Sequence, residues 1–111
     1  MAVMRKTVTA RAHVSLVRTE DGGRRSQVPA GFGYRPDHSF DSNDGTLVMG
    51  ELTFSGVEPV QPGDAREAQL KFITITGLLE EIEVGSQWKV QEGARVVGHG
   101  RILEILEIEY F

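Results

Sequence analysis

A strict alternation of apolar and polar side chains near the start of the chain is the feature that most constrains its fold. Between residues 7 and 16 every even position is apolar, from Val8 to Leu16, and every odd position is polar, from Thr7 to Ser15. Successive side chains of a β-strand point to opposite faces, so this pattern predicts a strand with one buried face. We expect the even-numbered residues to point into the core.

The remaining sequence repeats short strand-like segments between turn signals. Residues 66–75 contain helix-favouring Ala, Glu and Gln, but their alternation and a β-branched run at 73–76 favour a strand. Residues 78–82 could form one helical turn. Six strands and few helical signals predict an all-β closed barrel or a sandwich. The further strands are expected at about 34–41, 46–54, 66–75, 86–91 and 95–108.

Two strands carry irregular features. Tyr34 and Phe40 are expected as buried rings in the strand at 34–41, and Pro36 places that strand at a sheet edge or its own start. The last strand has apolar residues at both parities, so it either buries both faces or switches faces at a bulge. Gly98 and Gly100 are where a bulge or sharp bend would cost least. Apolar side chains left outside would imply a partner or self-association.

Composition restricts the classes of protein and of site. A length of 111 residues predicts a single domain over residues 1–111. The formal charge of -4, from 12 basic and 16 acidic residues, argues against non-specific nucleic-acid binding but leaves room for a local basic patch. The chain has no Cys, so disulfides and thiolate metal sites are excluded. No apolar run is long enough to cross a membrane and no signal peptide is recognisable, so we expect a cytoplasmic protein without a membrane partner.

The residues for catalysis or cofactor binding are missing. No Gly-Lys dipeptide occurs, so the phosphate loop of nucleotide-binding proteins is absent, and no Ser lies in a GxSxG motif. His13, His38 and His99 lack metal-site spacing, and each is expected to face solvent. The acidic run at 80–83 is expected to face water. The sequence therefore predicts neither an enzyme nor a protein with a cofactor or metal.

Residues 19–33 form a long Gly- and Pro-containing loop, for which a functional role and a plain surface role are equally good interpretations. Parts of this loop belong to an ordered set of motifs. Residues 20–24 and 33–36 read EDGGR and GYRP, Gly45 precedes VQPGD at 60–64, and residues 92–100 read EGARVVGHG. In order and spacing, this set resembles the EGGR…GYRP, TG…MPGD and EGGRTVGAG patterns of the third, C-terminal domain of bacterial elongation factor Tu. The resemblance covers about residues 7–107.

The resemblance implies a closed six-stranded antiparallel β-barrel without a catalytic group. In the family this domain packs on the other two domains, helps hold the T-stem of aminoacyl-tRNA and contacts the exchange factor. Arg24 matches the loop arginine that approaches the tRNA backbone, and Arg25 stands where the family often has His. Glu92 and Gly93 match the turn that touches the same stem.

The chain also departs from the family pattern. Asp37 replaces a Gln that follows the family's proline, and a carboxylate there would repel phosphate. The family's Lys-Pro before the fifth strand is replaced by an acidic and apolar segment at 77–81. These changes remove basic contacts to tRNA.

Three hypotheses of function follow. The leading one is a non-catalytic binding module that acts through an unidentified protein partner or through self-association as a homo-oligomer. The alternative is a translation-related protein that binds tRNA or another RNA through Arg24, Arg25 and Arg35. A weaker alternative is a decoy or immunity-type mimic that intercepts a partner of the elongation factor.

We predict that the protein binds neither GTP nor GDP. Nucleotide hydrolysis by such factors needs a glycine loop with its Lys, a Mg²⁺-holding Ser or Thr and a water-positioning residue, and the sequence supplies none of these motifs. Isothermal titration with each nucleotide and Mg²⁺ should show no binding heat. A dissociation constant in the micromolar range or tighter would contradict both the predicted fold and the predicted function.

Overall fold

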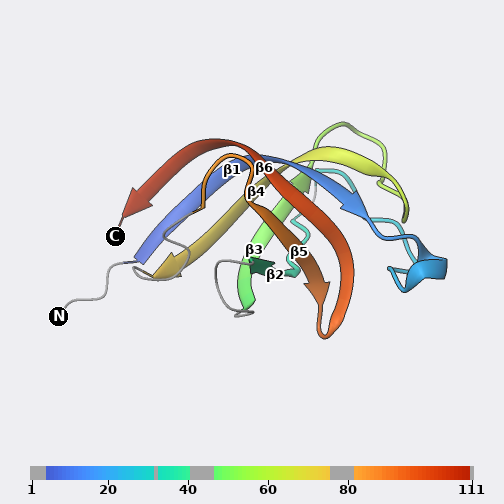
Figure 1. The fold of residues 1–111 in the computed structure, drawn as a ribbon. Coiled ribbons are helices and arrows are strands. Elements are labelled where there is room, and N and C mark those ends of the chain that lie inside the picture. The colour runs from blue at the N-terminus through green and yellow to red at the C-terminus, as the bar shows by residue number, and fades with distance from the viewer. Residues whose placement is uncertain (1–4, 32, 41–46, 76–81, 111) are drawn as a thin grey trace.

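The computed structural model describes residues 5–31, 33–40, 47–75 and 82–110. Their six strands close into an antiparallel barrel in the order β1-β4-β3-β2-β5-β6 (Figure 1), which confirms the predicted fold class. The only helical element of these residues is the three-residue turn η1 (Thr19–Asp21), and no described helix is long and apolar enough to cross a membrane. The strands are β1 (Arg5–Leu16), β2 (Asp37–Phe40), β3 (Leu47–Phe54), β4 (Ala65–Ile75), β5 (Gln87–Glu92) and β6 (Arg95–Tyr110).

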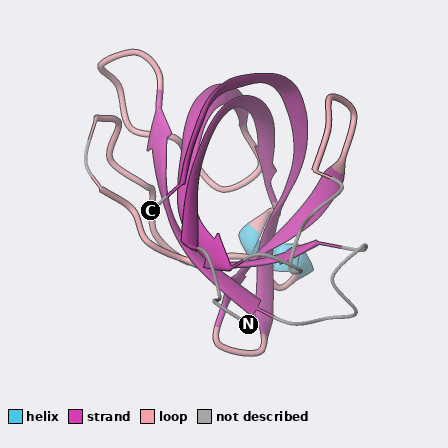
Figure 2. Cartoon of the chain, turned by 90° about the vertical axis from the view of Figure 1, so that its left-hand side faces the viewer, coloured by secondary structure: helices cyan, strands magenta, loops and turns pink. Residues whose placement is uncertain are grey.

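The alternation in β1 has the predicted consequence. Its even-numbered apolar side chains from Val8 to Leu16 are all buried in the barrel. β1 pairs with β4 along one edge and with β6 along the other, and the two long neighbours curve with it through the molecule (Figure 2). Three aromatic rings pack together in the core, where the Phe40 ring centroid lies 5.4 Å from that of Trp88 and 5.7 Å from that of Phe72.

The other predicted elements are found with small shifts. Residues 65–75 form a strand, which confirms the choice of strand over helix. Pro36 directly precedes β2, as a proline at a strand start should. Phe40 is buried, but Tyr34 is only half-buried and forms an isolated bridge with Leu52. Most of the helical turn expected at 78–82 lies outside the described residues.

The face switches of β6 lie at positions other than the expected glycines. In the pairing of β6 with β5, Val97 is an extra residue without a partner. In the pairing of β6 with β1, Leu103 and Leu106 are extra residues in the same way. Each extra residue shifts the side-chain parity by one, which explains the apolar residues at both parities. Gly98 and Gly100 pair in register instead. A Cβ on Gly100 would lie 2.4 Å from the Trp88 ring, so this glycine makes room for the indole.

His38 corrects the expectation that every histidine faces solvent, because its side chain is fully buried. Its Nδ1 accepts a hydrogen bond from Trp88 Nε1 at 3.0 Å, and its Nε2 lies 3.0 Å from the carbonyl oxygen of Gly50. A neutral imidazole protonated at Nε2 satisfies both partners. Burial lowers the pKa of His38 and outweighs the opposing effects of the Gly50 carbonyl and of Asp37.

We predict that His38 makes the barrel less stable in mild acid. Below the ordinary histidine pKa of 6.5, His38 binds a proton more readily in the unfolded chain than in the folded chain. The contribution of His38 to the free energy of unfolding is therefore complete above about pH 6.5 and decreases below it. The slope should stay below about 1.4 kcal/mol per pH unit, the limit that a difference of one bound proton sets. Urea unfolding between pH 7.5 and pH 5, a window chosen around the ordinary pKa of histidine, measures this slope.

A substitution tests the part of the buried histidine. His38→Gln should lower stability at neutral pH, because it disturbs the hydrogen bonds with Trp88 and Gly50, and it should flatten the acid slope. An equal slope in wild type and His38→Gln would show that another group causes the acid sensitivity.

Candidate functional site

Two of the predicted site residues meet each other in the structure. Arg24, in the connection between β1 and β2, donates from Nη1 to Oε2 of Glu92, the last residue of β5. The Tyr34 hydroxyl donates to the same carboxylate oxygen. The Arg24 guanidinium also lies over the Tyr34 ring, 5.1 Å from its centroid, in a cation–π contact. We call these three residues the Arg24 cluster.

The Arg24 cluster uses most of the donors of its arginine. Arg24 Nε and Nη2 donate to the carbonyl and the hydroxyl of Ser26, both at 3.2 Å. Burial lowers the pKa of Arg24, but the contacts with Glu92 and Tyr34 together outweigh burial and raise it. Burial, followed by the contact with Glu92, raises the pKa of Tyr34, so its hydroxyl stays a neutral donor. The cluster therefore holds a neutralised ion pair.

The loop reaches this position through backbone features that its sequence explains. Gly22 has a φ of 96° after η1, a left-handed conformation that glycine adopts readily. A Cβ on Gly23 would lie 2.1 Å from the carbonyl oxygen of Val17, so that position also needs glycine. Farther along, Val28 and Val60 exchange two backbone hydrogen bonds of 2.8 and 2.9 Å. The matched glycines thus have a structural role.

The remaining predicted site residues lie apart from one another. Arg25 is exposed, and among the described residues its side chain has no hydrogen bond or ion pair. Gly93 forms the turn between β5 and β6 with a φ of 62°. Arg35 has a side chain 74% exposed, with Nη2 3.4 Å from Oε2 of Glu51.

Arg35 lies at a cleft on the outer face of the barrel. Met49 and Ile73 line this cleft, and they are 75% and 58% exposed. The charged side chains of Arg35, Glu51 and Lys71 surround them, and the hollow measures about 420 Å³. We call this hollow the β3–β4 cleft; its remaining lining residues are Gly50 and Phe72.

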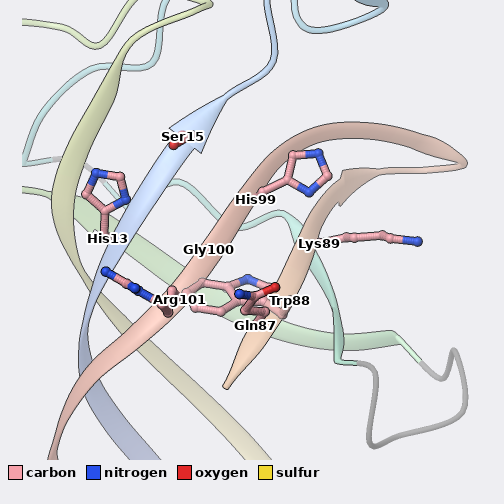
Figure 3. A pocket seen from close by; sticks show the side chains of 8 residues that line it. All are labelled: His13, Ser15, Gln87, Trp88, Lys89, His99, Gly100 and Arg101. Atoms are coloured by element: carbon pink, nitrogen blue, oxygen red, sulfur yellow. The ribbon is translucent and has the colours of Figure 1, made fainter. Parts of the chain in front are cut away.

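A second hollow was not foreseen from the sequence. It lies over β1, β5 and β6, measures about 370 Å³, and contains two histidines that are far apart in the chain (Figure 3). Antiparallel pairing of β1 with β6 sets His13 opposite Arg101 and Ser15 opposite His99. We call it the β1–β5–β6 groove; its lining residues are His13, Ser15, Gln87, Trp88, Lys89, His99, Gly100 and Arg101.

Neither hollow has the ligands of a metal centre. Within the described ranges, no three His, Asp or Glu side chains are grouped closely enough to hold a metal ion.

No family model matches the sequence. The functional argument therefore rests on the geometry of the Arg24 cluster, the β3–β4 cleft and the β1–β5–β6 groove.

We predict that Arg24 holds the long loop on the β5–β6 turn. Arg24→Gln removes an ion pair and a cation–π contact, so it should lower the free energy of unfolding by about 1 kcal/mol. Hydrogen exchange of the loop amides at 23–31 should become faster. Arg25→Gln is the matched control, because it removes the same charge from the neighbouring position without those contacts. Equal effects of the two substitutions would contradict the structural role of Arg24.

Proposed function

We propose that the protein is a non-catalytic binding module whose β3–β4 cleft receives an apolar side chain of another protein or of a second copy of the chain. The observation that carries this proposal is the pair of exposed apolar side chains, Met49 and Ile73, within a rim of charged ones. An apolar centre with a polar rim is the usual anatomy of a protein–protein interface.

The register of the sheet explains why the apolar side chains gather there. β3 pairs with β4 so that Gly50 opposes Phe72 and Glu51 opposes Lys71. Met49 and Ile73 follow these pairs on the outer face of adjacent strands. Burying each side chain against a partner would contribute roughly 1.5–3 kcal/mol. Leu47, 46% exposed and two residues before Met49, extends the apolar row along β3.

The charged rim adds selectivity for a partner surface. Arg35 and Glu51 make only a long contact of 3.4 Å, and both side chains remain accessible. Lys71 stands across from Glu51 on β4. Charges of both signs around an apolar centre favour a partner with complementary charges and disfavour like-charged surfaces. The cleft is therefore suited to a protein surface of mixed charge.

The alternative of RNA binding through the long loop has weaker support. The charge of Arg24 is already balanced by Glu92, and its donors point to Glu92 and Ser26. A phosphate would have to displace a carboxylate before it could bind Arg24. Arg25 remains accessible, but one arginine supplies a small part of the charge that RNA binding requires. The third hypothesis, a decoy or immunity-type mimic of the elongation factor, is supported only by the sequence resemblance.

We predict that a charge placed in the cleft abolishes the protein contact. Met49→Glu puts an unpaired carboxylate in the apolar centre, and burying it would cost more than the contact supplies. Proteins retained by the immobilised wild-type chain should be lost, and any concentration-dependent dimer should become a monomer in light scattering. Val57→Glu is the matched control, because Val57 is 94% exposed and lies outside the cleft.

The control defines what would contradict the proposal. If the immobilised Val57→Glu and Met49→Glu variants retain the same set of proteins, the contact does not use the cleft. A wild-type chain that stays a monomer, with no protein whose retention depends on Met49, would also contradict the proposed function.

A further inference from the structure

Basic side chains from three strands surround the β1–β5–β6 groove. Register pairing sets His13 opposite Arg101 and Lys89 opposite His99. In Figure 3 the first pair lies on one side of the Trp88 ring and the second pair on the other. Ser15 adds a hydroxyl at the edge on β1. Hydrogen-bond donors of four chemical types, imidazole, guanidinium, ammonium and hydroxyl, thus lie around one hollow.

The groove has no lining carboxylate to balance these charges. Its lining consists of the two basic pairs with Ser15, Gln87, Trp88 and Gly100. Among the residues that the structure describes, His13, Lys89, His99 and Arg101 form no ion pair with an acidic side chain. Two acidic residues of the neighbouring sheet positions, Glu67 opposite His13 and Glu104 on β6, both contact Arg11.

The groove holds uncompensated positive charge. Lys89 and Arg101 lie on the neighbouring strands β5 and β6, and no carboxylate lines the groove beside them. An anion bound between these two side chains would offset their charge.

The number of donors indicates the kind of anion. A phosphomonoester has three acceptor oxygens and up to two charges, whereas a carboxylate has two oxygens and one charge. Arg101 can bind two oxygens through its guanidinium fork, and His13, His99 and Ser15 each supply one further donor. A hollow of about 370 Å³ lies within the size range of small-ligand sites, so it has room for a phosphate and the group that carries it.

We propose that the β1–β5–β6 groove is a phosphate-binding site, distinct from the β3–β4 cleft and from the Arg24 cluster. Arg101 and the two histidines bind the phosphate oxygens, and Lys89 contributes charge from the rim. The phosphate is carried by a small phosphorylated compound or by the backbone of an RNA strand. Both sources present phosphate oxygens to the site. A small phosphomonoester offers three oxygens and up to two charges, whereas each diester of an RNA backbone offers two non-bridging oxygens and one charge, so the donor count favours the monoester.

Trp88 provides the readout, because it is the single tryptophan of the chain and lies at the groove. Its fluorescence should change when the full chain is titrated with inorganic phosphate or with a uridine oligonucleotide at low salt. Amide shifts in spectra of the ¹⁵N-labelled chain should move for residues 13–15 and 99–101. Affinity for the oligonucleotide should fall as salt is raised.

Matched substitutions locate the site. Arg101→Gln should weaken binding of the phosphate-bearing ligand about tenfold, which is typical for loss of a hydrogen bond to a charged group. Arg101→Lys keeps the charge and should restore part of the affinity, which separates a binding role from a folding defect. Arg5→Gln removes an exposed arginine outside the groove and should leave the affinity unchanged.

Substitutions test the part of the histidines. His13→Ala and His99→Ala should each weaken binding of inorganic phosphate, because each removes one ring nitrogen donor from the groove.

The outcomes separate the two sources and the failure of the proposal. If inorganic phosphate binds and displaces the oligonucleotide, the groove accepts phosphate from either source. Binding of the oligonucleotide alone, weakened by Arg101→Gln, assigns it to an RNA backbone. The proposal is overturned if neither ligand binds at low salt, if Arg5→Gln weakens binding as much as Arg101→Gln, or if a polyglutamate peptide binds as tightly as the oligonucleotide.

Discussion

The antiparallel pairing of β1 on both of its edges is the constraint on which the rest of the structure depends. β1 pairs with β4 from Arg5 to Ser15 and with β6 from Lys6 to Leu16, so one strand closes the barrel. Its inner face carries small and medium apolar side chains, and the buried aromatic rings of the core come from the other strands. Its outer face supplies one wall of the groove. A closed sheet also leaves fewer unpaired edges where other chains could add.

A buried polar chain of contacts accompanies this closure. Trp88 donates to His38, whose other ring nitrogen lies beside the carbonyl of Gly50, so these buried polar groups have partners. The same indole needs the space that Gly100 leaves empty. Core and surface are thus connected, because the ring that organises the interior also borders the groove.

The surface separates three kinds of chemistry. The Arg24 cluster contains an ion pair between the long loop and β5, in which the charges of Arg24 and Glu92 neutralise each other. The β3–β4 cleft has an apolar centre and mixed charges, whereas the β1–β5–β6 groove is basic. A formal charge of -4 for the chain does not prevent a local basic site, because salt screens charges farther apart than about 10 Å. Binding to the groove and to the cleft can therefore be tested independently.

The sequence by itself determined the properties that depend on neighbouring residues. The two-residue period predicted the buried face of β1, and the turn signals predicted the breaks between the strands. The position of His38 had a signal as well, since it shares its parity with Phe40 in β2, but polarity alone suggested the surface. The tertiary structure decided what depends on register. Arg24 and Glu92 were both predicted as contact residues, yet they bind each other, and only the β1–β6 pairing brings His13 to the same groove as His99. The bulges at Val97, Leu103 and Leu106 also arise from pairing between distant strands. The physical reason is that local sequence sets which face a side chain takes, whereas its neighbours across the sheet are set by the closure of the whole barrel.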